Sequence, residues 1–145
     1  MLEMTQKYKE RVEKLTSMLD LDMVVITEPT NVFYFTGCHI EPHERVLALL
    51  INLKTNDTAL MFPALDQEVV NDTATVDNHL PYNDGEDAFR LIFEHAIDAE
   101  SLGIEGGHVT YNRYQRLLEN YTADQIHSVE AQINQLRGKK DDDDR

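Results

Sequence analysis

The chain has 145 residues, of which 41% are hydrophobic, and its 27 acidic side chains outnumber 13 Lys and Arg, for a formal net charge of −14. This length suits a single domain that buries enough apolar surface to fold without disulfides or metal ions. Because the negative charge repels phosphate backbones and anionic lipids, the composition predicts neither nucleic acid nor a membrane surface as a partner.

The first part of the chain predicts one helix followed by two strands. Residues 23–27 are apolar and β-branched, and the polar residues 28–31 after them are typical of a turn, so 23–27 is predicted as a buried strand. Residues 32–36 are predicted as a second, aromatic strand that ends at Gly37. The helix comes first and is indicated by apolar residues spaced three or four apart, at Met4, Tyr8, Val12, Leu15 and Leu19.

A polar loop and a hairpin are predicted next. Residues 38–44 are mostly polar and contain Pro42, which favours a loop. The apolar run 45–52 is predicted to pair with 58–62 through the turn at 54–57, a length that suits a hairpin.

The rest of the chain alternates between predicted helices and strands. Residues from Ile133 onward are predicted as the start of a connection. Strands interleaved with helices predict an α/β fold around a mixed sheet, because the hairpin supplies antiparallel pairing and the β–helix–β stretches supply parallel pairing. The predicted helices lie near 65–70, 89–97 and 111–121, and the predicted strands at 75–80, 102–105 and 125–129.

The cysteine content and the two ends of the chain bear on compartment and boundaries. Cys38 is the single cysteine and cannot form an internal disulfide, so we expect a reducing compartment and a cytoplasmic protein. No secretory leader is apparent, and no run approaches the roughly 18 apolar residues of a membrane span. We expect one domain over residues 1–140. The acidic run 141–145 is then either a solvated tail or the place where a longer protein has been cut.

Several short motifs together resemble a known family. Their pattern is Arg-x-x-x-Leu, then Asp-x-x-Val-Ile, then Asn-Val-x-Tyr-x-Thr-Gly, then Glu-Arg before an apolar strand, and a closing Leu-Arg-x-x-Lys. The pattern resembles the N-terminal domain of creatinases and prolidases, above all that of Xaa-Pro dipeptidases and aminopeptidases, from about residue 5 to 140. The matching residues are Arg11, Leu15, Asp22, Val25, Ile26, Asn31, Val32, Tyr34, Thr36, Gly37, Glu44, Arg45, Leu136, Arg137 and Lys140.

This resemblance implies a fold for this chain and assigns catalysis to a second domain. The fold is a ribonuclease-H-like α/β sandwich that precedes a pita-bread catalytic domain. That second domain holds two divalent metal ions, typically Mn²⁺, Co²⁺ or Zn²⁺, through two Asp, one His and two Glu, and it hydrolyses the bond before a proline. In the family these ligands follow the Leu-Arg-x-x-Lys element, so this chain is expected to contain no catalytic residue and no metal site and to be inactive alone. Its implied partners are its own C-terminal catalytic domain, a second copy in a homodimer, and proline-containing peptides.

The loop after Gly37 contains the candidate site residues. In the family, a loop at this position leans over the active-site mouth of the partner subunit in the dimer. The resemblance therefore implies that its side chains touch substrate or gate entry, although they can equally be solvated loop residues. The four candidates are His39, Glu41, His43 and Arg45.

Some of these residues have other interpretations. A metal site that uses His39 and His43 would need a helix, which Pro42 disfavours. Cys38 beside His39 suggests a nucleophile and its base. Neighbouring side chains in an extended segment point apart, however, so Cys38 is predicted to be a small, buried hydrophobic residue.

Two further residues are predicted to have structural roles. Arg45 is at least as well suited to an ion pair with a carboxylate such as Glu28 or Glu44 as to a ligand contact. Tyr34 is predicted as a core residue.

The sequence therefore leaves three candidate functions. The first is a non-catalytic domain of a metal-dependent Xaa-Pro peptidase, which contributes dimer contacts and one wall of the substrate cleft. The second is a standalone module that binds a small ligand in a cleft near residues 38–45. The third and weakest is a small hydrolase that uses Cys38. The sequence does not separate dipeptidase from aminopeptidase or creatinase.

Overall fold

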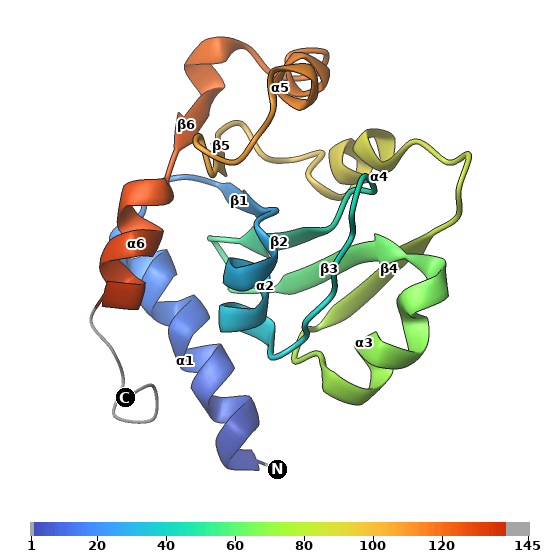
Figure 1. Cartoon of the computed structure of the whole chain (residues 1–145). Helices are drawn as coiled ribbons and strands as arrows, with labels where there is room; N and C mark the ends of the chain where they lie inside the picture. Colours follow the sequence, from blue (N-terminus) through green and yellow to red (C-terminus); the bar gives the residue numbers. More distant parts are fainter. Residues whose placement is uncertain (1, 139–145) are drawn as a thin grey trace.

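A six-stranded sheet organises the described part of the chain (Figure 1). The structure is a computed structural model that describes residues 2–138, with side chains from residue 5 onward. The prediction for the acidic run 141–145 lies outside the described residues. The strand order is β4-β3-β2-β1-β5-β6. The strands are β1 (Met23–Ile26), β2 (Ala48–Asn52), β3 (Thr58–Pro63), β4 (Asn78–Tyr82), β5 (Leu102–Ile104) and β6 (Ile126–Ser128).

The sheet is mixed, as the sequence predicts. Strands β2 and β3 form the expected antiparallel hairpin, and β1 is antiparallel to β2 on its other side. The pairs β1–β5, β5–β6 and β3–β4 are parallel. In the hairpin turn, Asn56 has a φ of 67°. Asparagine tolerates this left-handed conformation better than most residues, which fits the turn prediction.

Helices cover both faces of the sheet (Figure 1). Strand alternation explains the two cores: Val24 and Ile26 of β1 join one apolar cluster, and Met23 and Val25 join the other. The first cluster also takes residues from α1, α2, α3 and α6, and the second takes residues from α4 and α5. The helices are α1 (Leu2–Met18), α2 (Pro29–Thr36), α3 (Gln67–Thr73), α4 (Ala88–His95), α5 (Tyr111–Leu117) and α6 (Glu130–Gly138), with 3-10 turns η1 (Ala64–Asp66) and η2 (Ala123–Gln125).

The predicted strand over residues 32–36 is wrong, because this segment is helix α2. Its start carries helix signals that outweigh the β-prone aromatic residues. Glu28 is the N-cap, and its carboxylate accepts hydrogen bonds from the backbone N–H groups of Thr30 and Asn31 at 3.0 and 3.1 Å. Pro29 occupies the first turn, where the backbone N–H that proline lacks would have no partner within the helix. The turn chemistry of residues 28–31 therefore marks the start of a helix and not the end of a strand.

The prediction that the residues from Ile133 onward start a connection is also wrong. Residues 133–138 belong to α6, in which Ile133 and Leu136 are buried in the core that α1 and α2 share. A spacing of three places both side chains on one helix face. The fourth strand lies slightly later than predicted, at Asn78–Tyr82, so it includes Tyr82.

Candidate functional site

Gly37 sets the direction in which the chain leaves α2. It has a φ of 79°, and its N–H donates to the carbonyl of Phe33 at 2.8 Å, which closes the helix. A Cβ at this position would lie 2.8 Å from the Tyr8 ring of α1. Glycine is therefore required here by the left-handed backbone and by the close approach of α1.

The first half of the 38–45 loop alternates between the core and solvent. Cys38 and Ile40 are buried at 1% and 5% exposure, whereas His39 and Glu41 are exposed. Side chains two apart in an extended segment share a side. This places His39 Nε2 3.1 Å from Glu41 Oε1, and the ring of His39 lies edge-on to Phe33. Two of the four predicted site residues are thus brought together.

The second half of the loop turns at Pro42. The N–H of Arg45 donates to the carbonyl of Pro42 at 3.0 Å, and His43 has a φ of 57°. His43 and Glu44 are exposed in this turn. The turn presents the third predicted site residue to solvent.

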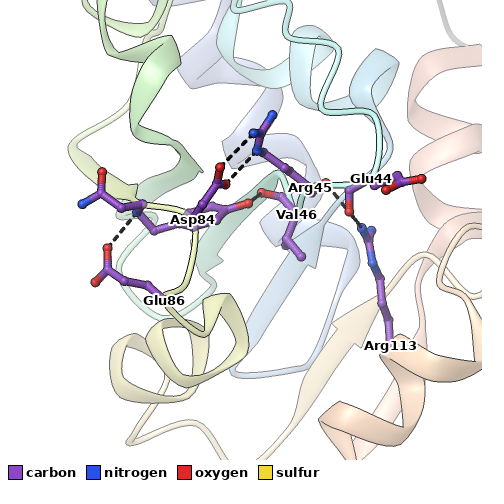
Figure 2. Close-up of polar contacts among 8 residues, drawn as sticks. Glu44, Arg45, Val46, Asp84, Glu86 and Arg113 are labelled. Atoms are coloured by element: carbon purple, nitrogen blue, oxygen red, sulfur yellow. Dashed lines mark hydrogen bonds and ion pairs between the residues drawn. The ribbon is translucent and has the colours of Figure 1, made fainter.

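Arg45, the fourth predicted site residue, forms a bidentate ion pair with Asp84 (Figure 2). Its Nε lies 2.9 Å from Oδ1 and its Nη2 3.0 Å from Oδ2. The Arg45 guanidinium lowers the pKa of Asp84. Glu28, suggested by the sequence as a partner, instead caps α2. Asp84 was missed because it lies 39 residues away and becomes a neighbour only through the parallel β3–β4 pair.

Two more side chains bind the backbone on either side of Arg45. Arg113 of α5 donates from Nη2 to the carbonyls of Glu44 and Arg45, both at 3.4 Å (Figure 2). The hydroxyl of Tyr82, at the end of β4, donates to the carbonyl of Val46 at 2.6 Å. Burial raises the pKa of Tyr82, so this hydroxyl keeps its proton.

A network around the buried Glu105 ties the first turn of α2 to α6. Glu105, which follows β5, is 1% exposed, and its Oε1 accepts from the backbone N–H of Thr27 at 2.6 Å and of Glu28 at 2.9 Å. Its Oε2 accepts from Asn31 Nδ2 at 2.5 Å. Asn31 Oδ1 in turn accepts from Arg137 Nη1 of α6 at 2.8 Å. We call Asn31, Glu105 and Arg137 the buried network.

Tyr34 lies against the same helices and is buried, as predicted, although on a helix. The guanidinium of Arg11 lies 4.1 Å from its ring centroid, and Arg11 Nη1 donates to the Tyr34 carbonyl at 2.9 Å. The guanidinium of Arg137 is 5.7 Å from the same ring. These cation–π contacts join α1, α2 and α6. Several of the motif residues from the sequence therefore have structural roles here.

Cys38 has the environment of a small core residue. Burial raises the pKa of its thiol, which disfavours the thiolate that a nucleophile needs. Its exposed neighbour His39 pairs with Glu41. The interpretation of Cys38 as a buried apolar side chain is confirmed.

The described residues contain little that suggests metal or membrane binding. Within residues 2–138 there is no group of three or more His, Cys, Asp or Glu side chains placed to hold a metal ion. The loop within these residues thus offers no set of metal ligands, and the two divalent ions that the family resemblance implies are assigned to the catalytic domain. In the same part of the chain, no helix has both the length and the apolar character to cross a bilayer.

A groove of about 510 Å³ lies away from the predicted cleft. Its walls are formed by α1, by the hairpin turn at 55–58 and by residues 74–77, with Tyr8 and Phe35 among its lining residues. None of the residues described in the 38–45 loop lines it.

Comparison with known families decides the identity of this fold. The profile of the Creatinase/Prolidase N-terminal domain matches residues 9–138. The chain belongs to this family. The resemblance read from the sequence motifs is therefore confirmed, and so is the predicted mixed sheet flanked by helices.

Curated relatives of this family member are peptidases. An uncharacterized peptidase of Staphylococcus haemolyticus is 33% identical over 135 residues, which are 91% of this chain and 37% of the relative. One from Staphylococcus aureus is 36% identical over 123 residues, 85% of this chain and 34% of the relative. The chain thus spans little more than a third of the length of these relatives.

Solved structures of the family share the fold. A proline dipeptidase from Streptococcus pneumoniae has a TM-score of 0.78 at 24% identity and covers 92% of this chain and 98% of that structure. The N-terminal domain of an Xaa-Pro dipeptidase from Streptococcus pyogenes has a TM-score of 0.75 at 19% identity, with 88% and 98% covered. A prolidase from Pyrococcus horikoshii has a TM-score of 0.73 at 21% identity, with 92% of this chain but only 36% of the prolidase covered.

Proposed function

We propose that this chain is the non-catalytic N-terminal domain of a metal-dependent Xaa-Pro peptidase. Membership in the family and relatives nearly three times as long support this proposal. Two divalent ions, Mn²⁺, Co²⁺ or Zn²⁺, would be held by the catalytic domain that follows, where they would supply an activated water. This chain would contribute dimer contacts and one wall of the cleft that receives proline-containing peptides.

The observation that carries the proposal is the presentation of the 38–45 loop. Cys38 and Ile40 are buried in the core, and this directs His39 and Glu41 outward. The turn at Pro42 then exposes His43. Three polar side chains on a loop that is fixed at both ends suit contact with a polar ligand from another chain or domain.

The first test is the reading frame beyond Arg145. Continuation into a segment rich in His, Asp and Glu supports the proposal, whereas a stop codon near residue 145 favours a standalone module. The second test is an assay of Xaa-Pro dipeptides with Mn²⁺. We expect hydrolysis by the longer protein and none by residues 1–145, and activity of this chain alone would contradict the proposal.

The role of the loop is tested in the longer protein. Replacement of both His39 and Glu41 by Ala should raise KM about tenfold with little change in thermal stability, because both side chains are exposed. His127→Ala, an exposed histidine on β6, is the matched control and should leave KM unchanged. An unaltered KM in the loop variant would show that these loop side chains do not contact the substrate.

A standalone ligand-binding module is the second candidate, and the groove beside α1 favours it. The groove is open, with Lys9, Glu13 and Asp77 among its lining residues, so it suits a small polar ligand. Ligand-observed NMR with a library of small polar compounds tests it. Binding that Lys9→Ala abolishes would support this candidate.

A further inference from the structure

Two segments far apart in the sequence converge on the end of the 38–45 loop (Figure 2). Tyr82 is the last residue of β4, Asp84 lies in the turn that follows it, and Arg113 comes from α5. Together they bind the guanidinium of Arg45 and the carbonyls of Glu44, Arg45 and Val46. We call Tyr82, Asp84 and Arg113 the loop clamp.

The turn that carries Asp84 is itself held in place. The carboxylate of Glu86 accepts from the backbone N–H of Asn83 at 2.7 Å, and the N–H of Glu86 donates to the Asn83 carbonyl at 3.0 Å (Figure 2). Gly85 supplies the left-handed conformation in this turn, with a φ of 97°. The carboxylate of Asp84 is thus presented to Arg45 from a closed turn.

The two halves of the loop are held by different forces. The first half is held by the burial of Cys38 and Ile40, which depends on the core. Glu44 and Arg45 are exposed, and burial resumes only with Val46 and Leu47, so burial of their own side chains does not hold the second half. Polar contacts with the loop clamp are therefore what fixes the path of the chain after Pro42.

We propose that Tyr82, Asp84 and Arg113 are positioning residues that hold the second half of the loop, so that His43 faces the ligand beside His39 and Glu41. In this proposal Arg45 acts through Asp84, which engages two of its three guanidinium nitrogens, and not by contact with substrate. The loop clamp itself is independent of the proposed peptidase function, but its consequence for substrate binding rests on that function.

The clamp is tested first in residues 1–145 by hydrogen exchange. The reporter is the amide of residue 45, which donates to the Pro42 carbonyl, and the internal control is the amide of Cys38, which donates to Thr36 Oγ1 at 3.0 Å. Asp84→Ala should speed exchange at residue 45 by up to about fivefold, as expected for an exposed ion pair, without change at Cys38. Arg90→Ala, which removes an exposed arginine paired with Glu94, is the matched control and should change neither amide.

A charge exchange separates positioning from direct contact. Arg45→Asp should speed exchange at residue 45, and addition of Asp84→Arg should restore its protection by re-forming the pair in reverse. Arg113→Met should have an effect similar to that of Asp84→Ala. Unchanged exchange at residue 45 in Arg45→Asp, Asp84→Ala and Arg113→Met would overturn the proposal.

The same variants in the longer peptidase distinguish the clamp from the proposed function. If KM rises in Arg45→Asp and returns toward the unmodified value in the charge-exchanged variant, Arg45 acts by positioning. If exchange recovers but KM does not, Arg45 contacts substrate directly and its assignment is overturned. If exchange responds and KM never does, the loop clamp stands and the loop's role in the substrate cleft fails.

Discussion

The buried network and the loop clamp use the same chemical groups in different surroundings. In the buried network, Glu105 is 1% exposed and accepts hydrogen bonds from the buried Asn31 amide and from the half-buried backbone of Thr27 and Glu28. At the loop clamp, the side chain of Asp84 is 73% exposed and that of Arg45, which it binds, is 41% exposed. A lost partner leaves a buried polar group unsatisfied in the first case, whereas water replaces the partner in the second.

This difference separates the stability of the fold from the geometry of the loop. The buried network joins β5, α2 and α6, so its loss affects the whole domain. The exposed Arg45–Asp84 pair at the loop clamp can change with little effect on folding. Four predictions follow this contrast from the largest effect to the smallest.

Removal of the Glu105 carboxylate should have the largest effect. Glu105→Ala leaves the N–H groups of Thr27 and Glu28 and the Asn31 amide without their acceptor, so we expect a loss of about 3 kcal/mol or more in the free energy of unfolding. Urea unfolding followed by circular dichroism measures it, since the chain has no tryptophan. The control Glu94→Ala breaks an exposed pair and should cost about 0.5 kcal/mol or less. Equal losses in the two variants would mean that burial does not distinguish these carboxylates.

Removal of the Asn31 side chain should have the next largest effect. Asn31→Ala takes one donor from Glu105 and one acceptor from Arg137, with an expected loss of about 2 kcal/mol. The same urea titration measures it. Thr30→Ala, at the exposed neighbouring position, is the control and should stay within about 0.5 kcal/mol of the unmodified chain. A neutral Asn31→Ala would show that Arg137 and Glu105 find other partners.

The rate at which the Cys38 thiol reacts should depend on the buried network and not on the loop clamp. Because the thiol is buried and its pKa is raised, its reaction with an aromatic disulfide reagent should be about tenfold or more slower than in urea. Glu105→Ala should speed this reaction, and Asp84→Ala should leave it unchanged. Faster reaction in Asp84→Ala would show that both halves of the loop open together.

The pH response of Asp84 should be the smallest effect. Arg45 lowers the pKa of Asp84 below the ordinary value of 3.8, so the pair's contribution is complete above that value and disappears as the pH falls through the folded pKa. Arg45→Gln should raise the pKa of Asp84, measured by the chemical shift of its carboxyl carbon. Asp87, whose pKa is lowered by Arg116, is the internal control and should titrate as before. An unmoved Asp84 titration would show that the ion pair does not form in solution.

Much of the fold was predictable because its signals are local. The hairpin at residues 48–63 follows from two apolar runs and a short polar turn, and α1 follows from its apolar spacing. The strand prediction for residues 32–36 rests on their β-prone side chains, whereas the helix start at Glu28 and Pro29 determines the structure of α2. Glu28 and Pro29 are recognisable helix-start residues, so this helix could also have been predicted.

The site was predictable only in part, because its contacts are not local. The 38–45 loop follows from Gly37, Pro42 and polar composition, but nothing near Arg45 in the sequence points to Asp84 or Arg113. Their approach depends on the order of the strands in the sheet. The buried network needed the same information, since Asn31 and Arg137 are 106 residues apart.

The contact between Gly37 and the Tyr8 ring has a consequence for shortened forms of the domain. The ring leaves no room for a Cβ at residue 37, so α1 forms the surface against which the chain turns out of α2. A version that begins after Tyr8 would keep all six strands and all the loop residues. It would nevertheless lose the surface that sets the exit angle of the loop, so experiments on the loop require the first helix.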